Sequence, residues 1–428
     1  MKLPHPKWPL VDQAQSKPVF SLPDWRALRN DFPVLTNSQP ALHYLDSAAS
    51  SQKPQAVIDA ISHCYSHNYG PVHRGLYALA EVASEAYEAA RQTIANFVNA
   101  ENTNEIVFTR SATEAINLVA HGWAGQHLKP GEDIWVSQME HHANFLPWQR
   151  VCQTLGTRLR VIPLDEDGQL DFETAEGIFG ANTGLIAITQ VSNVLGTINP
   201  IEQIVRRANR QSIPVLVDAA QAVGHMAVDV QALNCDFLVA SAHKMCGPGG
   251  IGFLYGKQER LAETDPLLLG GGMVDEVDID QSSWAEIPAR FEAGSPNLSG
   301  AVGFAAAINY LQDIGMGAIE QRVQQLTSLA YQTLSEIDGL ALYGSPESTS
   351  HSGILSFNVD DIHPHDVAHI AAEHGVAIRA GHHCCQPLMQ RLGVSSTARA
   401  SFSFYNNEQD IAALAKAILD AKQILGNR

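Results

Sequence analysis

The chain has few cysteines and none in the pattern of a disulfide framework. Its 428 residues include six cysteines, no two of them have Cys-x-x-Cys spacing, and only Cys384 and Cys385 are close together. Small secreted domains and structural zinc sites both rely on regularly spaced cysteines. We therefore expect reduced thiols, a cytoplasmic location and no metal site, and the adjacent pair needs an explanation of its own.

Long apolar runs are also missing. The first residues, MKLPHPKWPL, place prolines where a signal peptide has a continuous apolar stretch, and no later run is long enough to span a bilayer. We find no internal repeat and no low-complexity tract. These absences predict neither secretion nor a membrane partner.

Basic residues are scarce compared with acidic ones. The chain has 27 Lys and Arg against 45 Asp and Glu, a net charge of −18, which repels nucleic acid and anionic surfaces. An anionic small molecule would need local donors, such as helix N-termini. Hydrophobic residues make up 45% of the chain, enough for a large core, and its length suggests about two or three domains.

Short apolar runs alternate with helical patterns in the central part of the chain. The expected strands are EIVFT, DIWVS, LRVIPL, GLIAITQVS, PVLVDAA and DFLVASAHK, and the expected helices include SEAYEAARQTIANFVNA, ANFLPWQRVCQTLG and IEQIVRRANRQS. This alternation predicts an α/β fold with a mostly parallel sheet covered on both faces. A proline-rich arm with one short helix precedes it, and the helix GAVGFAAAINYLQDIG leads into a smaller α+β unit.

Polar side chains follow four of these strands at their carboxyl ends, where ligands collect in such sheets. Ser111 and Thr113 open a helix whose N–H groups suit a phosphate, although helix capping alone commonly explains such residues. Asp218 could hold a protonated ring nitrogen or cap a helix. Lys244 could form an imine or be simply solvated, and His141 could stack on a planar ring or lie on the surface.

Taken together, these four strand ends match the needs of one cofactor. Lys244 follows Asp218 at a separation that suits neighbouring strands of one sheet, so amine, carboxylate, imidazole and phosphate nest would converge. Pyridoxal phosphate requires an amine for its aldehyde, a carboxylate for its ring nitrogen and an anchor for its phosphate. The joint pattern predicts this cofactor, although no single match is specific.

The stretch RAGHHCCQP, residues 379–387, raises three alternatives: a metal site, a redox pair or a nucleophile. Four consecutive side chains cannot easily point at one tetrahedral ion, because ligand pairs normally have residues between them. A disulfide between adjacent cysteines would be strained. These arguments disfavour the metal site and the redox pair, but the residues by themselves leave the role of the two thiols open.

The sequence resembles the class V aminotransferase family of fold-type I pyridoxal phosphate enzymes, and within it the group II, SUF-type cysteine desulfurases and selenocysteine lyases. The motifs that carry the resemblance run in order from about residue 25 onward: YLDSAA, VHRG, SATEAINLV, EHHAN, VSNVLGT, VDAAQ, SAHKMCGPGGIG, RFEAGSPN and RAGHHC. It implies an α/β fold with a seven-stranded, mostly parallel sheet in a cofactor-binding domain of residues 41–298. An arm of residues 1–40 would pack with a small α+β domain of residues 299–428.

The resemblance also implies roles for individual residues around the cofactor. Lys244 would bind the cofactor aldehyde, Asp218 the pyridine nitrogen and Gln221 the phenolic oxygen, while His141 would stack on the ring. The phosphate would be held by the Ala112 turn and by the side chains of Thr113, Ser241, His243 and, from a neighbouring subunit, Ser295. The last contact implies a homodimer with composite active sites.

On the substrate side, the resemblance implies that Arg379 and Asn193 hold the carboxylate of L-cysteine, with Arg74 and His73 near the same pocket. Cys384 would attack the substrate sulfur, release L-alanine and carry a persulfide for an acceptor protein in iron–sulfur cluster assembly. A thiolate needs a cationic neighbour, and His383 or Arg379 could supply it.

Two departures from the family pattern bear on this interpretation. Cys385 stands where relatives usually have a small residue, which raises the question whether a second thiol could share the persulfide. Ala112 stands where many relatives have a hydroxyl residue, so one hydrogen bond is missing. Alternative functions are selenocysteine lyase or cysteine sulfinate desulfinase on the same scaffold, a transaminase or kynureninase-like enzyme, and a non-catalytic cofactor-binding scaffold.

Overall fold

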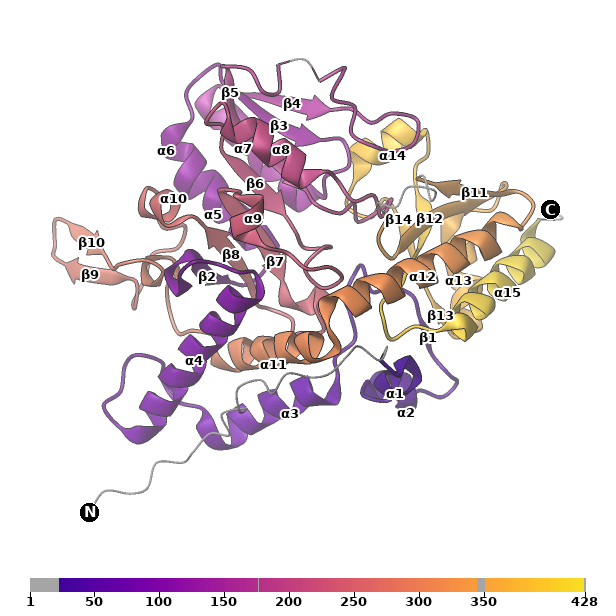
Figure 1. Cartoon of the computed structure of the whole chain (residues 1–428), viewed down its shortest axis with the longest axis horizontal. Helices are drawn as coiled ribbons and strands as arrows, with labels where there is room; N and C mark the ends of the chain where they lie inside the picture. The colour runs from indigo at the N-terminus through magenta and orange to yellow at the C-terminus, as the bar shows by residue number, and fades with distance from the viewer. Residues whose placement is uncertain (1–22, 176, 345–350, 427–428) are drawn as a thin grey trace.

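The computed structural model describes residues 23–175, 177–344 and 351–426 (Figure 1). Within them the largest sheet has seven strands in the order β2-β8-β7-β6-β5-β3-β4, all parallel except β8. Their bounds are β2 (Ile106–Thr109), β3 (Asp133–Ser137), β4 (Arg158–Ile162), β5 (Thr183–Thr189), β6 (Val215–Asp218), β7 (Phe237–Ser241) and β8 (Gly252–Gly256). The predicted α/β fold is confirmed, and each of the six predicted runs forms a strand.

The seventh strand, β8, lies in a glycine-rich run that the sequence pattern did not identify as a strand. Gly252 begins it at a point where a Cβ atom would lie 2.4 Å from the Ala240 carbonyl oxygen and 3.1 Å from Ser111. The strand runs antiparallel between β2 and β7, so close backbone approach explains the glycine.

Helices cover both faces of this sheet (Figure 1). Alternate strand residues point to opposite faces, so Ile186 and Val217 belong to one apolar core while Ala187 and Leu216 belong to the other. The helices of this part of the chain are α3 (Gln55–His63), α4 (Ala78–Phe97), α5 (Ala112–Leu118), α6 (Gly125–His127), α7 (Leu146–Leu155), α8 (Ile201–Asn209), α9 (Val230–Leu233), α10 (Gln258–Ala262) and α11 (Leu298–Ile314). The four helical patterns predicted here correspond to α4, α7, α8 and α11.

A second, antiparallel sheet forms the right-hand part of the molecule in Figure 1. Its order is β11-β12-β15-β14, with bounds β11 (Leu340–Tyr343), β12 (Ile354–Val359), β14 (Arg379–Gly381) and β15 (Thr397–Ser401). It packs against α12 (Met316–Ser335), α13 (Pro364–Glu373) and α15 (Glu408–Leu425), and α14 (Gln386–Leu392) follows β14. This is the predicted smaller α+β unit.

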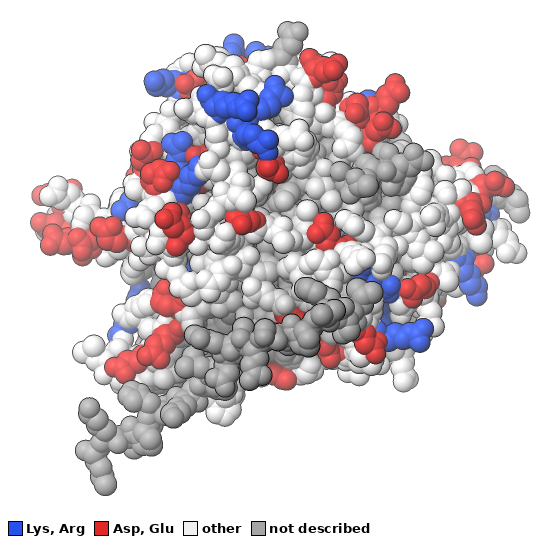
Figure 2. All heavy atoms as spheres, viewed as in Figure 1, with Lys and Arg blue, Asp and Glu red and all other residues white. Residues whose placement is uncertain are grey.

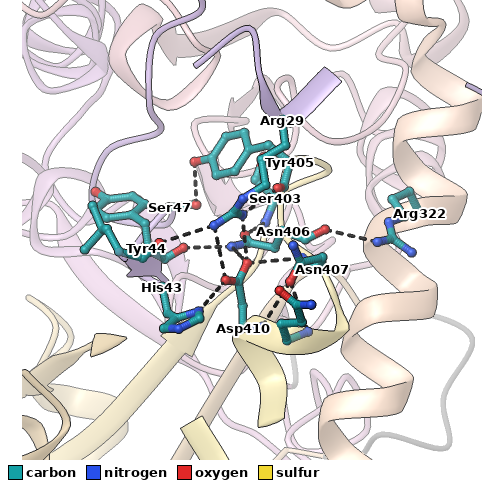
Figure 3. Close-up of polar contacts among 12 residues, drawn as sticks. Arg29, His43, Tyr44, Ser47, Arg322, Ser403, Tyr405, Asn406, Asn407 and Asp410 are labelled. Atoms are coloured by element: carbon teal, nitrogen blue, oxygen red, sulfur yellow. Dashed lines mark hydrogen bonds and ion pairs between the residues drawn. The ribbon is translucent and has the colours of Figure 1, made fainter. Parts of the chain in front are cut away.

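The N-terminal segment packs on the smaller unit. Two short helices, α1 (Trp25–Arg29) and α2 (Pro33–Asn37), stand where one was predicted, because Pro33 starts a new helix. Strand β1 (His43–Tyr44) pairs with β13 (Val376–Ala377), and Asp410 of α15 accepts hydrogen bonds from the Arg29 guanidinium and the His43 ring (Figure 3). The arm predicted before α1 lies outside the described residues.

The domain limits themselves stay a prediction. Helix α11, which starts at Leu298, packs against α3 and α4 of the larger unit, and the chain enters the smaller unit with α12. The transition in the packing therefore comes at the junction of these two helices.

Exposed acidic side chains gather on a hairpin that projects from the larger unit. It consists of β9 (Val274–Val277) and β10 (Ser282–Trp284), and its exposed acids are Asp275, Glu276, Asp278 and Asp280 (Figure 2). In the described part of the chain, no helix combines the length and the apolar character that crossing a bilayer would take.

Candidate active site

Lys244 lies at the carboxyl end of β7, on a short turn after Ser241. Burial lowers the pKa of its amine from 10.5 to about 8, Asp218 opposes this shift, and the positive charges of Arg399 and Arg379 add to it. An amine with a pKa near 8 is unprotonated in a useful fraction at neutral pH, as a nucleophilic amine must be.

Asp218 ends the neighbouring strand β6 and is 5% exposed. One of its carboxylate oxygens accepts the Ala220 N–H at 3.0 Å, which leaves the second oxygen for another donor. Burial raises the pKa of this carboxyl, and Lys244 opposes the shift. Gln221 follows three residues later and donates its Nε2 to the Ala48 carbonyl at 2.8 Å.

His141 follows β3 and is kept neutral. Burial, followed by the charge of Lys244, lowers the pKa of its ring to about 3. The Ala143 N–H donates to its Nδ1 at 3.1 Å, so the neutral ring carries its proton on Nε2. An uncharged, oriented imidazole of this kind can stack on a planar ring.

The start of α5 forms the predicted phosphate end of the site. Ser241 Oγ accepts the Ala112 N–H at 2.8 Å, which leaves the serine hydroxyl proton free to donate. Thr113 is exposed on the first turn. Ser111 caps the helix as predicted, but the Glu114 carboxylate accepts the Arg110 N–H instead of completing a capping box.

His243 precedes the lysine. Burial, then the charges of Lys244 and Lys53, lower the pKa of its ring to about 4, so the ring is neutral at pH 7. It can offer one N–H to an anion.

These residues fit pyridoxal phosphate. The low-pKa amine of Lys244 suits its aldehyde, the free carboxylate oxygen of Asp218 suits its ring N–H, and the hydroxyl of Ser241 at a helix N-terminus suits its phosphate. All three come from strand ends at the same edge of the parallel sheet.

Two arginines face the site from the smaller unit. Arg379 of β14 and Arg399 of β15 are direct cross-strand partners. Arg399 is 1% exposed and bonds Asp46 at 2.9 Å and the Asn193 carbonyl at 2.8 Å, while its buried Nε has no partner. Among the described residues, no side-chain hydrogen bond or ion pair involves the Arg379 guanidinium. The pair therefore offers several free donors to a carboxylate.

The segment that carries Cys384 lies against this pocket. The His142 N–H donates to the Cys384 carbonyl at 2.7 Å, and Asn193 Nδ2 donates to the His383 carbonyl at 2.8 Å. His383 and Cys384 both have positive φ angles, 51° and 55°, which bends the chain sharply after β14. Cys384 is partly exposed, and its charge is among those that perturb Lys244 and Arg399.

The structure corrects one expectation about the thiolate. His383 is 2% exposed, and burial together with Arg399 and Arg379 lowers the pKa of its ring to about 3. Its Nε2 lies 3.0 Å from Thr397 Oγ1. A neutral, buried imidazole cannot be the cationic neighbour of Cys384, so that role is left to the arginines and Lys244.

Cys385 has a different environment from its neighbour. Its side chain is 0% exposed in the main apolar core, and burial raises the pKa of its thiol. All six cysteines are free. A buried, protonated thiol behaves as a small apolar side chain and is inert as a nucleophile.

Three predicted residues are exposed on the surface. His73 bonds Glu88 at 3.1 Å, and Arg74 donates to the Gly294 carbonyl at 3.4 Å, next to Ser295. Among the described residues, no hydrogen bond or ion pair joins these three side chains to Lys244 or to Asp218.

Two buried ionisable residues in the site were missed in the sequence. Arg399 stands among small residues in STARAS, and a charge in an otherwise buried strand is a usable signal. Glu140 is 0% exposed and accepts from Ser137 Oγ, Asn144 Nδ2 and the Thr189 N–H. Burial raises the pKa of its carboxyl to about 8, and its bonds fix the chain just before His141.

The lowered pKa of Lys244 predicts selective labelling of the cofactor-free protein. The unprotonated amine reacts, so the rate of acetylation of Lys244 is expected to rise with pH through a midpoint of about 8, compared with 10.5 for an ordinary lysine. Competitive labelling at trace acetic anhydride followed by peptide mass analysis measures this midpoint. A value near 10.5 would show that the amine is fully solvated.

Comparisons with known proteins agree on one family. The profile of the family described as aminotransferase class-V matches residues 43–414. A probable cysteine desulfurase of Halalkalibacterium halodurans is 47% identical over 399 residues, which cover 92% of this chain and 97% of that protein. Cysteine desulfurase structures from Thermococcus onnurineus and Escherichia coli superpose with TM-scores of 0.90 and 0.88 at 38% identity, each covering 95% of this chain and 100% of the other.

Proposed function

Since the chain belongs to the class-V aminotransferase family and is a cysteine desulfurase with pyridoxal phosphate as cofactor, we propose that Cys384 takes the sulfur of L-cysteine as a persulfide and passes it to an acceptor for iron–sulfur cluster assembly. The observation that carries this is the pairing of two groups in one pocket. Cys384, Arg379 and Arg399 all lie close enough to Lys244 for their charges to perturb the pKa of its amine.

The residues divide the work as follows. Arg379 and the free Nε of Arg399 hold the substrate carboxylate, which orients the amino acid over Lys244. Asp218, held by the Ala220 N–H, keeps its carboxylate toward the cofactor ring nitrogen. When bound, pyridoxal phosphate supplies an electron-withdrawing ring that stabilises negative charge at the substrate Cα. Lys244 Nζ takes the Cα proton, since its pKa lies near neutrality.

Sulfur transfer is a displacement by Cys384. Its thiolate attacks the substrate sulfur, so an S–S bond forms while the Cβ–S bond breaks and its electron pair stays with the carbon part. Protonation of that part gives L-alanine, and the persulfide stays on Cys384. Cys384 is close enough to Lys244 and Arg399 for its charge to perturb the pKa of both cations.

The direct test uses the purified holoenzyme. Incubation with L-cysteine and a reductant should yield alanine and sulfide in equal amounts. Without reductant, peptide mass analysis should find one added sulfur on Cys384. Alanine without sulfide, or turnover only when a keto acid is added, would contradict the proposal.

We also propose a homodimer whose sites take Ser295 from the partner copy. Ser295, Arg74 and His73 are exposed, and Arg74 donates to the carbonyl of Gly294, the residue before Ser295. The same segment exposes large apolar side chains, including Leu76 at 102% and Tyr77 at 54%. Contiguous exposed apolar groups are typical of protein interfaces, and a second copy of the chain would cover them.

Mixed dimers test the shared site. Lys244→Ala and Ser295→Glu should each inactivate the enzyme, the second because a carboxylate repels the phosphate. If Ser295 acts across the interface, unfolding and refolding a 1:1 mixture should restore about a quarter of wild-type activity, because half the dimers then hold one intact site. A mixture that stays inactive, although dimers form in sedimentation, would place Ser295 in its own subunit's site, and a Ser295→Glu homodimer that keeps its activity would place Ser295 outside both sites.

The acceptor and the location remain part of the proposal. The six free cysteines are consistent with a reducing cytoplasm. Transfer of labelled sulfur from Cys384 to a scaffold protein that assembles iron–sulfur clusters would support the assigned pathway, and transfer only to low-molecular-weight thiols would not.

A further inference from the structure

The segment Asp46–Lys53, DSAASSQK, contacts several parts of the active site at once. It follows β1 and precedes α3, and the sequence offered only its first residues as part of a family motif. No catalytic role was predicted for any of its side chains. Its hydrogen bonds nevertheless run to both the cofactor side and the carboxylate side of the pocket.

On the cofactor side, the segment holds the peptide bond just before Lys244. The His243 carbonyl accepts from Ser51 N at 2.9 Å, Ser51 Oγ at 3.0 Å, Ser50 Oγ at 3.2 Å and Lys53 Nζ at 3.4 Å. Ser51 Oγ also accepts the Cys246 N–H at 2.7 Å, on the other side of the lysine. Lys244 is therefore clamped from both neighbours.

Lys53 fixes the shape of this clamp. Its ammonium donates to Ser50 Oγ at 3.2 Å and to the Ser51 carbonyl, in addition to the His243 carbonyl. Burial lowers the pKa of this amine. All three bonds of this partly buried ammonium go either to the Ser50–Ser51 turn or to the His243 carbonyl that the turn contacts. We therefore assign Lys53 the role of positioning that turn.

On the carboxylate side, the segment holds Arg399. Asp46 accepts from Arg399 Nη2 at 2.9 Å, and the Ala48 N–H donates to Ser401 Oγ at 2.9 Å, two residues farther along β15. The Ala48 carbonyl accepts from Gln221, which extends the contacts to the predicted ring-binding amide. Asp46 thus determines where the guanidinium of Arg399 points.

Two tyrosines brace the segment from the smaller unit. The hydroxyl of Tyr405, 0% exposed, lies 2.7 Å from Ser47 Oγ and accepts the Gln52 N–H at 3.1 Å. The hydroxyl of Tyr44 donates to the Ser50 carbonyl at 2.6 Å. Figure 3 shows how both tyrosines join the network around Arg29 and Asp410, so the segment is tied to α1 and α15.

We propose that Asp46–Lys53 is a positioning strap, a segment that holds the Arg399 guanidinium and the Lys244 amine at a fixed position relative to each other. Asp46 and Lys53 are its two anchoring residues. The inference rests on the proposed function, because it assigns Arg399 to the substrate carboxylate and Lys244 to the cofactor. Neither anchor touches the reacting atoms. Loss of either anchor would loosen its own end of the strap most and, through the shared turn, the other end to a smaller degree.

The first test needs no catalysis. In cofactor-free Lys53→Met, the Cys246 amide is expected to exchange its hydrogen about tenfold faster than in the wild type, because its acceptor Ser51 is no longer held. Lys53→Arg keeps a cation that can reach the same carbonyls and should restore most of the protection. Lys422→Met is the matched control. Lys422, on α15, also donates to a backbone carbonyl, that of Asp338, but it is not part of the strap.

The second test separates the two ends of the strap in the holoenzyme. Asp46→Asn is expected to raise KM about tenfold with little change in kcat, because Arg399 binds the carboxylate equally in ground and transition states. Lys53→Met is expected to raise the dissociation constant of pyridoxal phosphate and lower kcat, each about tenfold. In the double variant the losses in kcat/KM should be smaller than the product of the two single losses, because one shared strap is already loosened.

The outcomes are distinct. Wild-type exchange at Cys246 in folded Lys53→Met, or losses that simply multiply in the double variant, would overturn the strap. If Lys53→Met does not fold, Ser50→Ala, which removes one acceptor of Lys53 and one donor to the His243 carbonyl but leaves Ser51 intact, is read in the same way. Failure of the proposed function appears separately, as a wild-type enzyme that makes no sulfide, and leaves the exchange measurement valid.

Discussion

Lys244→Ala is expected to abolish the release of alanine and sulfide from L-cysteine, with a loss in kcat/KM of at least about 10³-fold. The variant loses both the amine that binds the cofactor aldehyde and the base for the Cα proton. Treatment with borohydride should fix cofactor to the wild type at Lys244 and fix none to the variant. Rates of sulfide release and peptide mass analysis measure the two effects.

Lys129→Ala serves as the control, since Lys129 is an exposed lysine on the surface. It should keep wild-type activity and labelling. Lys244→Arg tests whether a positive charge at this position is enough for activity. We expect it to be as inactive as the alanine variant, because a guanidinium is not deprotonated near neutral pH. Substantial activity in either Lys244 variant would mean that the cofactor is bound elsewhere.

Cys384→Ala is expected to lose at least about 100-fold in activity with L-cysteine, because no other exposed thiol lies in the pocket to attack the substrate sulfur. Cys385→Ala should stay within about threefold of the wild type, since a buried, protonated thiol is inert. The pair is a matched control, as the two residues are adjacent and chemically identical. Sulfide release and the added mass on each cysteine distinguish them.

The same two variants also separate the remaining substrate alternatives. If Cys384→Ala loses activity on L-cysteine but keeps it on selenocysteine or cysteine sulfinate, the thiol is needed only for sulfur. If it loses nothing on any substrate, Cys384 is not the nucleophile. A persulfide found on Cys385 would contradict the structural role given to that residue.

The main sheet could largely be predicted from the sequence because its strands are buried on both faces and therefore form continuous apolar runs. The run PVLVDAA forms β6, which ends at Asp218, and the run DFLVASAHK forms β7, which ends at Ser241. Strand β8 was not recognised, because glycines that allow close packing against Ser111 and Ala240 look like a loop in the sequence. The sequence pattern also missed the break between α1 and α2, where Pro33 starts a second helix.

The cofactor end of the site was accessible to sequence reasoning for a related reason. Asp218, Ser241 and Lys244 follow their strands directly, so the fold class alone brings them to one edge. The contributions of Glu140, Asp46 and Lys53 were not accessible, and for Arg399 the sequence offered only the signal of a charge in a buried strand. Each acts through a partner distant in sequence, as Asp46 does through Arg399, and no local pattern encodes such a contact.

By itself, the sequence determined the α/β architecture, the chemical groups at the strand ends and the family resemblance, because these depend on local periodicity and on ordered motifs. Only the tertiary structure decided which of two adjacent cysteines is buried, that His383 is neutral, and that His73, Arg74 and Ser295 are exposed. Those properties depend on burial and on charges brought together from separate segments. Solvation and electrostatics follow distance in space rather than distance along the chain.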